Sequence, residues 1–563
     1  MNQKILSILT KEESNLLEQS MSVMDRYYNS SERLLQYNNG SDDGDVRGSS
    51  HYALGLLLRN ETGDLERACD VIRRVLEMQY DAPNEIYHGT FKVSQNQPNP
   101  PIGNMNWKEF SPGYAYFLNT TFEKIKEQLV NLIQKDSANM PLNIDKKSIG
   151  NYFDMAVNKV LPKVWVSYDP NWREFITTTF ATILENFEGV LSKDLVEQMD
   201  ISIKRAVEAS IDRYLPDAIP MNTNIILMHL FIVGYYGERY GNIEWIAHAE
   251  READNIYNEY MEFKSFAEFN SSTYYGVDLM TLGLWRKYLK SKKLVKIGIE
   301  LEDGLWENIA LFYNPNLSNI SGPFARCYEM DIVEHSSLGQ FIYMALGEKF
   351  RYLAVENTET SHDPVIILSE SNMPDYLKPY FMEHKEDRQI EKKFRELCER
   401  GKPGENRTLC TATAWIEKDI MLGALSGSNN TSGQLHPVTI YWKAPDGQVC
   451  SIRLLRRLKG GHWSQHLKGI RYNAKAQKDI ITVEVNFDLQ EAVELFFEVN
   501  GIDPATCQIN PDKWALPGLI AEIKANALHY KVASVDGKLE IIFLYNPEDA
   551  SSSRMNFEIK LLK

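Results

Sequence analysis

The sequence predicts an α+β multidomain protein, in which an N-terminal (α/α)6 toroid of helical hairpins is followed by a C-terminal antiparallel β-sandwich. Apolar residues recur at helical spacing through most of residues 115–346. From residue 411 onward the hydrophobic period becomes two, and Asp446-Gly447 and Asp536-Gly537 supply hairpin turns. This change of period separates the two parts of the chain.

The helical part contains about a dozen predicted helices. We expect them near residues 12–36, 51–58, 64–78, 115–135, 147–161, 171–189, 193–214, 221–239, 242–263, 273–290, 294–313 and 331–346. The segment Ile225-Ile226-Leu227-Met228 is apolar on more than one face, which favours an inner ring of buried helices. A toroid of six hairpins is therefore expected. A solenoid is the alternative, although no repeat of fixed period is evident.

Six segments of the C-terminal part have strand character, at residues 438–442, 449–455, 480–485, 495–499, 539–544 and 555–561. The charged run at residues 385–400 is predicted to be a helix with a solvated face. We therefore expect a toroid at residues 1–350 that carries the catalytic or ligand-binding site, a linker with a charged helix at 351–410, and a β-sandwich at 411–563.

Composition excludes several classes of function. The net charge of -16 argues against nucleic acid as the main partner, although local arginines can still bind an anionic substrate. The 6 cysteines form no C-x-x-C pair, so a zinc or redox motif has no support. The longest apolar run, residues 225–233, is far shorter than the roughly 20 residues that span a membrane. Because the N-terminus also lacks a secretory signal pattern, we expect a cytoplasmic protein with no membrane partner.

The stretch at residues 270–279 combines an amide, two adjacent phenols and a carboxylate. Buried polar groups lower stability unless they are paired, so these side chains are unsuited to filling a core. We interpret the stretch as one wall of a polar, aromatic pocket. Tyr274 is a candidate catalytic residue, and Asn270, Tyr275 and Asp278 are candidate substrate-binding residues.

A second candidate stretch precedes the helix expected at 171–189. Asp169 comes before Pro170, which holds it extended at the helix start, and it is the foremost candidate acid or base. Asn171, Trp172 and Arg173 are candidates for substrate binding, with Trp172 as a stacking plate and Arg173 as a carboxylate clamp. The alternative is a helix cap followed by a core tryptophan.

A third candidate stretch contains Asp45, Arg47 and His51. Asp45 is a candidate base, or alternatively a plain helix cap, while Arg47 and His51 are candidates for binding substrate. No cofactor is expected, but the carboxylates of Asp42, Asp43 and Asp45 also suit a divalent cation.

Further polar residues complete the predicted site. His88, in a loop rich in Pro and Asn, is a candidate for proton transfer, or alternatively an exposed turn residue. Asn222 and Asn224 begin an apolar helix, where Asn224 caps the helix or binds substrate hydroxyls. Arg326, Tyr328 and His335 are candidates for substrate binding, and Asp331 for catalysis. Asp331 and His335 are four residues apart and would share a helix face, where they could form a purely structural ion pair.

The predicted layout resembles carbohydrate-active enzymes, both six-hairpin glycosidases and toroid polysaccharide lyases. Residues 270–275, Asn-Ser-Ser-Thr-Tyr-Tyr, are similar to the Ser-Pro-Thr-Tyr loops of heparinase-type lyases, with Ser272 in place of proline. Segments 45–52, 168–175 and 274–284 also resemble a set of uncharacterised microbial proteins. This second resemblance covers about residues 45–345 and implies no activity, because a fold by itself does not fix function.

We therefore expect an intracellular enzyme that cleaves a glycosidic bond in an oligosaccharide by carboxylate acid/base chemistry, with Asp169 and a second acid. A lyase is the first alternative: Tyr274 or His88 removes a proton, while an amide and an arginine neutralise a uronate carboxylate. A terpenoid cyclase or dehydratase with an aromatic cavity is the second alternative. A non-catalytic glycan-binding protein is the third. All of these readings assume that the candidate residues meet at one mouth of the helical ring.

Overall fold

A computed structural model describes residues 9–37, 44–97, 100, 107–110, 112–136, 148–153, 169–215, 222–396, 408–429, 433–465, 467–527, 530–549 and 552–562. The chain divides into two compact units, and each is described by itself. Unit 1 is formed chiefly by Met21–Met221. Unit 2 is formed by Leu9–Ser20, Asn222–Glu399 and Gly404–Lys563.

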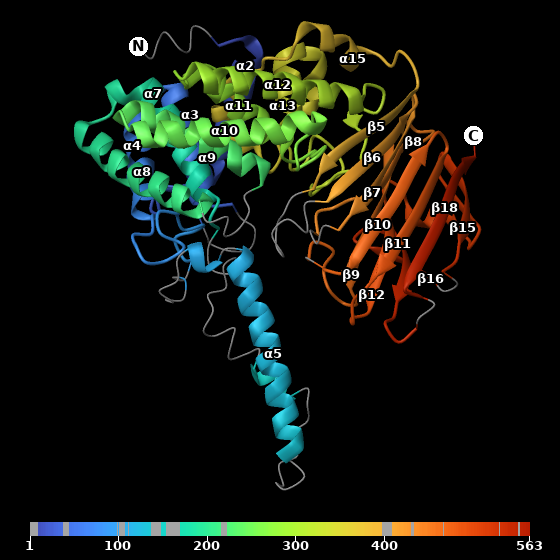
Figure 1. Cartoon of the computed structure of the whole chain (residues 1–563). Helices are drawn as coiled ribbons and strands as arrows, with labels where there is room; N and C mark the ends of the chain where they lie inside the picture. Colours follow the sequence, from blue (N-terminus) through green and yellow to red (C-terminus); the bar gives the residue numbers. More distant parts are fainter. Residues whose placement is uncertain are drawn as a thin grey trace. The chain divides into compact units, whose positions relative to one another are not determined.

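Unit 1 is helical (Figure 1). Its helices are α3 (Val46–Arg59), α4 (Asp64–Glu77), α5 (Pro112–Asp136), α7 (Trp172–Phe187) and α8 (Lys193–Tyr214), and the end of α2 (Lys11–Tyr27) also belongs to it. The hairpin of α3 and α4 shows how local sequence sets the boundaries. Asp45 caps the start of α3, and Asn60 ends it in the left-handed conformation that asparagine tolerates.

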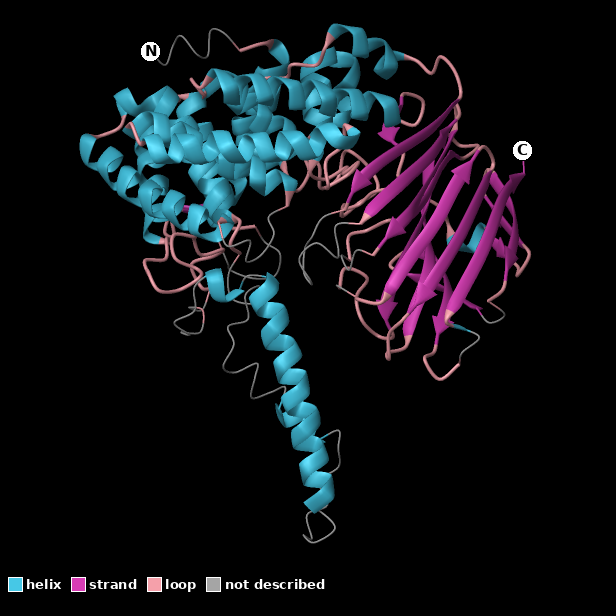
Figure 2. Cartoon of the chain, in the orientation of Figure 1, coloured by secondary structure: helices cyan, strands magenta, loops and turns pink. Residues whose placement is uncertain are grey.

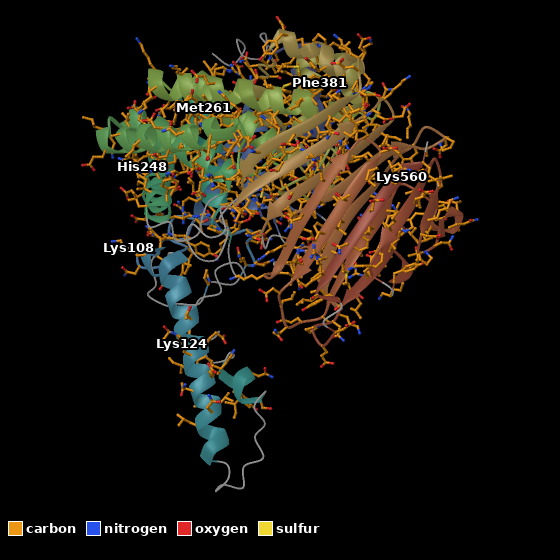
Figure 3. All side chains as sticks on the ribbon, turned by 45° about the vertical axis from the view of Figure 1, so that its right-hand side comes forward. Lys108, Lys124, His248, Met261, Phe381 and Lys560 are labelled. Carbon is orange, nitrogen blue, oxygen red and sulfur yellow. The ribbon has the colours of Figure 1, made fainter. Side chains whose placement is uncertain are left out.

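Unit 2 begins with helices and ends with a sheet (Figure 1). Its helices are α9 (Thr223–Tyr240), α10 (Ile243–Phe263), α11 (Tyr275–Tyr288), α12 (Lys292–Phe312), α13 (Leu338–Leu346), α14 (Asp363–Ser369) and α15 (Lys378–Met382). Two-residue strands β3 (Tyr313–Asn314) and β4 (Asn319–Ile320) follow α12. As expected from its apolar run, α9 is buried around most of its circumference. Figure 3 labels His248 on α10 and Phe381 on α15.

The sheet of unit 2 is antiparallel throughout, and Figure 2 shows its strands in magenta. The strands are β5 (Arg388–Arg395), β6 (Leu409–Ile416), β7 (Ile420–Ser428), β8 (Val438–Lys443), β9 (Val449–Leu458), β10 (Ile470–Gln477), β11 (Ile480–Phe487), β12 (Val493–Asn500), β13 (Gln508–Ile509), β14 (Lys513–Leu516), β15 (Leu519–Ala525), β16 (Tyr530–Val535), β17 (Lys538–Tyr545) and β18 (Arg554–Leu562). Their order is β13-β14-β15-β18-β11-β10-β7-β8-β9-β12-β17-β16, with β6 joining β5 to β7.

Burial along the strands follows their position in the sheet. Alternate residues of β10 are buried, as in a strand with one solvated face, whereas every residue of β8 except Lys443 is buried. The predicted turn Asp536-Gly537 joins β16 to β17 with positive φ at both residues, the conformation that a two-residue hairpin requires. The predicted fold class, a toroid-type region of helical hairpins followed by an antiparallel β-sandwich, is confirmed.

Some of the predicted elements differ from the structure in type or in bounds. Residues 388–395 of the charged run form β5, not a helix, because their backbone pairs with β6 from Arg388 opposite Ile416 to Arg395 opposite Leu409. The helix expected at 331–346 begins only at Leu338. Of the helix expected at 147–161, residues 148–153 are helical and the remainder lies outside the described residues.

Candidate functional site

The loop between α10 and α11 is held by hydrogen bonds to the segment at residues 321–330. Ser271 Oγ donates to the backbone oxygen of Arg326 at 2.6 Å, and Ser272 Oγ donates to that of Glu329 at 2.8 Å. In the other direction, the backbone N–H of Tyr328 donates to Thr273 Oγ1 at 3.1 Å. The small polar residues of the loop are therefore the side chains that fix the two segments together.

Asn270 and Tyr275 serve this same framework. Both are fully buried, and the Tyr275 hydroxyl accepts hydrogen bonds from the Asn270 backbone N–H and from Asn308 Nδ2. The Asn270 amide donates to the backbone oxygens of Ser321 and Pro323, and its positive φ of 54° suits asparagine. The sequence predicts that Asn270 and Tyr275 bind substrate; in the structure both side chains are buried.

Tyr274 is partly exposed and contacts Arg326. The Arg326 guanidinium carbon lies 4.4 Å from the centroid of the Tyr274 ring, within the range of a cation–π contact. Arg326 Nη1 donates to Glu268 Oε1 at 2.6 Å, and Arg326 Nε donates to Gln434 Oε1 at 2.8 Å. Asn222 completes the group, with its amide oxygen accepting from Arg326 Nη2 at 3.0 Å. We call these five residues the Tyr274–Arg326 site.

The environment of Tyr274 alters its acidity. Burial raises the pKa of the Tyr274 phenol well above its ordinary value, and the Arg326 guanidinium acts in the opposite direction. The Tyr274 ring lies 6.0 Å from that of Tyr328, whose ring lies 5.8 Å from that of His335, measured between centroids. Because Tyr328 is 37% exposed, this row of rings leads from the site to solvent.

Two segments outside the named strands, around Phe324 and His436, complete the surroundings of Arg326. Phe324 and His436 exchange backbone hydrogen bonds, and the Cys327 N–H donates to the Gln434 backbone oxygen at 2.9 Å. The His436 ring is fully buried, 6.3 Å from the Phe324 ring and 5.8 Å from the Trp463 ring. Burial lowers the pKa of His436 well below its ordinary value, and nearby arginines add to this effect, so the imidazole is neutral at physiological pH.

A cavity of about 290 Å³ adjoins the segment at residues 329–334. Its lining includes Glu329, Asp331, Glu334 and Arg453. Arg453 is buried, donates through Nε to Glu498 at 2.7 Å, and donates through Nη1 to the Tyr328 backbone oxygen at 3.0 Å. Arg453 therefore links the sheet to the exposed Tyr328.

Asp331 and His335 do not share a helix face, because the helix begins after them. Asp331 Oδ1 accepts the backbone N–H groups of Val333 and Glu334 at 2.8 and 2.7 Å, which closes a turn. The His335 Nδ1 lies 2.7 Å from Thr358 Oγ1. The predicted shared helix face of Asp331 and His335 was therefore wrong, because residues 331–337 form turns before α13 begins at Leu338.

Asp278 and Asn224 are buried beside the Tyr274–Arg326 site. The Asn224 backbone N–H donates to Glu268 Oε2 at 3.1 Å, while its side chain is 2% exposed. Asp278, in the first turns of α11, has no exposed surface. The sequence predicts that both bind substrate; in the structure both side chains are buried.

In unit 1, Asp45 is the predicted N-cap of α3, and its Oδ1 accepts the Gly48 N–H at 3.0 Å. His51 is buried one turn further along α3. The Arg47 guanidinium lies 4.9 Å from the centroid of the Phe175 ring and 5.4 Å from that of Trp172. Trp172 is buried, and the Arg47 guanidinium lies against its ring.

Asp169 and His88 also form local structural contacts. Asp169 Oδ1 accepts the Asn171 N–H at 2.8 Å, the contact of a turn that leads into α7. His88 Nδ1 accepts the Ala82 N–H at 3.0 Å, and burial lowers the pKa of this imidazole. The alternative of a helix cap does not apply to Asp169, because Asn171 is the N-cap residue of α7. His88 lies in a turn but is only partly exposed.

Asn171 and Arg173 belong to a buried ionic group. Arg173 Nη2 donates to the His88 backbone oxygen at 2.7 Å, and Asn171 Oδ1 accepts from Arg213 Nη2 at 3.0 Å. Glu174 lies at the centre, with Oε2 3.5 Å from Arg213 Nη1 and Oε1 accepting from Ser210 Oγ at 2.6 Å. The predicted site residues thus fall into two groups, one in each compact unit.

The described part of the chain contains no group of three or more His, Cys, Asp or Glu side chains that could hold a metal ion. Asp42 and Asp43 lie outside the described residues. The same part of the chain contains no helix long and apolar enough to cross a membrane.

The sequence did not predict several residues of the Tyr274–Arg326 site and its surroundings. Glu268 was detectable, since it is an acid between the aromatic residues Phe266 and Phe269 just before the candidate loop. Gln434, His436 and Trp463 carried no comparable signal, because they come from the sheet region more than 100 residues further along the chain.

The fold defines the chain as a protein of toroid-type helical hairpins joined to an antiparallel β-sandwich. The chain belongs to the family described as "Domain of unknown function (DUF8769)", whose model matches residues 14–159 and 154–393. No curated protein matches the sequence.

The chain is also similar to several solved structures. One is a heparinase III, the BT4657 gene product, with 12% identity, 90% of each chain covered and a TM-score of 0.30. Another is a mutant of the heparan sulfate lyase HepC from Pedobacter heparinus, with 10% identity, coverage of 81% of this chain and 75% of that one, and a TM-score of 0.30. A third is the Streptomyces coelicolor A3 chondroitin AC lyase in complex with chondroitin sulphate, with 10% identity, coverage of 98% and 79%, and a TM-score of 0.39.

Proposed function

We propose that this chain is a carbohydrate lyase that cleaves a glycosidic bond next to a uronic acid by β-elimination. The observation that carries the proposal is the contact of Arg326 with Tyr274, in which a fixed guanidinium lies 4.4 Å from the centre of a partly exposed phenol ring. A lyase of this kind needs a base for a carbon acid and a positive group for the adjacent carboxylate.

The reaction assigns a role to each group. Tyr274, as phenolate, removes the proton on the carbon next to the uronate carboxylate. Arg326, with the Asn222 amide beside it, stabilises the negative charge that builds up on that carboxylate. A C=C bond then forms as the C–O bond to the leaving sugar breaks. The Tyr274 hydroxyl, protonated in the first step, returns its proton to the leaving oxygen.

Substrate binding follows from the row of rings that starts at Tyr274. Tyr328 and His335 continue it, and exposed aromatic rings suit the apolar faces of sugars. Glu268 and Gln434 hold Arg326 at the inner end of this row. An oligosaccharide lying along the rings would place one carboxylate at the arginine.

Hydrolysis, the first reaction predicted from the sequence, has less support from these contacts. Asp45, Asp169 and Asp331 each accept backbone N–H groups within their own turn. Hydrolysis requires two carboxylates that flank one bond, and local turn contacts of this kind are sufficient to explain all three residues.

The test is to incubate the purified chain with a panel of uronate-containing oligosaccharides and to record the ultraviolet absorbance of the new C=C bond. We expect the absorbance to rise with at least one substrate. Tyr274→Phe should lower turnover at least about a hundredfold, with an unchanged circular dichroism spectrum. Tyr376→Phe is the matched control, because that phenol is exposed and bonds only to Glu307 among the described contacts. New reducing ends without a rise in absorbance would contradict elimination and favour hydrolysis.

A further inference from the structure

A second carboxyl group lies behind the Tyr274–Arg326 site. Asp278 lies in α11, one helical turn beyond the N-cap residue Tyr274. Its backbone N–H donates to the backbone oxygen of Tyr274 at 2.9 Å. Its side chain has no exposed surface, and neither carboxylate oxygen has a hydrogen-bond partner among the described residues. An ionised carboxylate in that position would lack both water and a donor, which strongly disfavours the charge.

The neighbouring carboxyl group of Glu268 is in the opposite situation. Glu268 Oε1 accepts from Arg326 at 2.6 Å, and Glu268 Oε2 accepts the Asn224 N–H at 3.1 Å. These bonds favour the charged form of Glu268. The charge of Glu268 adds to burial in raising the pKa of Asp278 well above its ordinary value.

Other groups around α11 do not change this balance. The buried acid and imidazole groups on the helices that pack against α11 are His229 on α9, Glu302 on α12 and Asp363 on α14. Glu302 pairs with Arg286 at 2.9 Å, two turns further along α11. Asp363 is also buried, its carboxylate oxygens have no hydrogen-bond partner among the described residues, and burial alone raises its pKa. Of the site's residues in the described part of the chain, Glu268 is the one whose charge raises the pKa of Asp278.

We infer that Asp278 is a positioning residue that carries a proton: its neutral carboxyl group allows the adjacent Glu268 to stay ionised, and Glu268 holds Arg326 against Tyr274. The activity part of this inference rests on the proposed lyase function. The protonation part does not, because it concerns the free protein. If Asp278 were ionised, Glu268 and Asp278 would repel each other, and the proton that one of them took up would weaken the bond from Arg326.

Infrared spectroscopy tests the proton directly, because a protonated carboxyl group has its own C=O stretching band. The difference spectrum of the wild-type chain minus Asp278→Asn, at about pH 7.5, should contain this band. Asp363→Asn is the matched control, since it should remove a separate band of a carboxyl group that does not touch the site. Absence of the Asp278 band would overturn the inference.

The link to Glu268 is tested by titrating the band. In Glu268→Gln, the pH at which the Asp278 band disappears should fall, whereas the midpoint of the Asp363 band should stay unchanged. Arg326→Gln serves as a second variant if Glu268→Gln does not fold, because loss of the arginine lets Glu268 take up a proton and again lowers the Asp278 midpoint. An unchanged midpoint would overturn the link.

Turnover tests the positioning role. Because the role requires only a neutral group at position 278, folded Asp278→Asn should keep turnover within about threefold of the wild type, with the same dependence on pH. A loss of about a hundredfold in folded Asp278→Asn would overturn the positioning role. If the wild-type chain makes no unsaturated product at all, the proposed function fails, and the two infrared measurements still decide whether Asp278 holds a proton under the influence of Glu268.

Discussion

The guanidinium of Arg326 faces the ring of Tyr274 at 4.4 Å, although the two residues are 52 positions apart in the sequence. Glu268 fixes the arginine from one side and Gln434 from another. Because the guanidinium is already held in place, it does not have to reorient when an anion forms next to it, and it lowers the free energy of that anion. The predictions below follow from this arrangement and from the structure that supports it.

Activity should rise with pH. Burial raises the pKa of Tyr274 well above its ordinary value, so at neutral pH only a small fraction of the phenol is ionised. If the phenolate is the base, kcat/KM should increase about tenfold per pH unit below that pKa. The measurement is the initial rate of absorbance increase between about pH 6 and pH 9. A rate independent of pH in this range would contradict the phenolate of Tyr274 as the base.

Replacing Arg326 by lysine should lower turnover about a hundredfold. The charge remains, but an ammonium group cannot reproduce the planar contacts to Glu268, Gln434 and Asn222. Steady-state kinetics would measure this loss. Arg395→Lys is the control, because Arg395 forms a similar two-bonded pair with Glu262 on an exposed surface. Equal effects of the two substitutions would contradict a special role for Arg326.

Asp169→Asn separates elimination from hydrolysis. The amide oxygen of asparagine can accept the Asn171 N–H as the carboxylate does, so we expect little change in thermal stability. Under the proposed elimination, turnover should stay within about threefold of the wild type. A fall of at least about a hundredfold in a folded variant would instead identify Asp169 as a catalytic acid or base.

Gly423→Ala should destabilise unit 2 by about 1–3 kcal/mol and lower activity. A Cβ at position 423 of β7 would lie 2.1 Å from the backbone oxygen of Gly322, which belongs to the segment that leads to Arg326. Denaturant unfolding would measure the change. Gly189→Ala is the control, since nothing lies within 4 Å of a Cβ there, and its stability should change by less than about 1 kcal/mol.

Stability should fall with decreasing pH because of His436. Its folded-state pKa lies well below the ordinary value, so the unfolded chain takes up a proton that the folded chain resists. This contribution to stability is present above about pH 6.5 and is lost, by up to about 1.4 kcal/mol per pH unit, as the pH falls below it. Unfolding free energies of the wild type and His436→Gln between pH 5 and pH 8 should therefore converge on acidification. Parallel curves would show that His436 is not responsible.

Short sequence patterns were sufficient to predict helix caps and tight turns, because residues that are adjacent in the sequence determine these structures. Asp45 caps α3, and Asp536-Gly537 forms the tight turn between β16 and β17, as predicted. The charged run at 385–400 could not be assigned in this way. Its buried residues Ile390 and Phe394 are four apart, a spacing that places two residues on one face of either a helix or a strand. Pairing with β6, which lies beyond residue 408, decided the strand.

The sequence by itself determined the class of fold, because hydrophobic period and turn chemistry are properties of adjacent residues. It also named Tyr274 and Arg326, but only as two candidates among many, with Asp169 as the foremost. Only the tertiary structure decided that Tyr274 faces Arg326 while Tyr275 enters the core, and that Glu268 and Gln434 hold the arginine. These contacts join residues that are tens to more than a hundred positions apart in the sequence. Such residues come into contact only when the whole core packs.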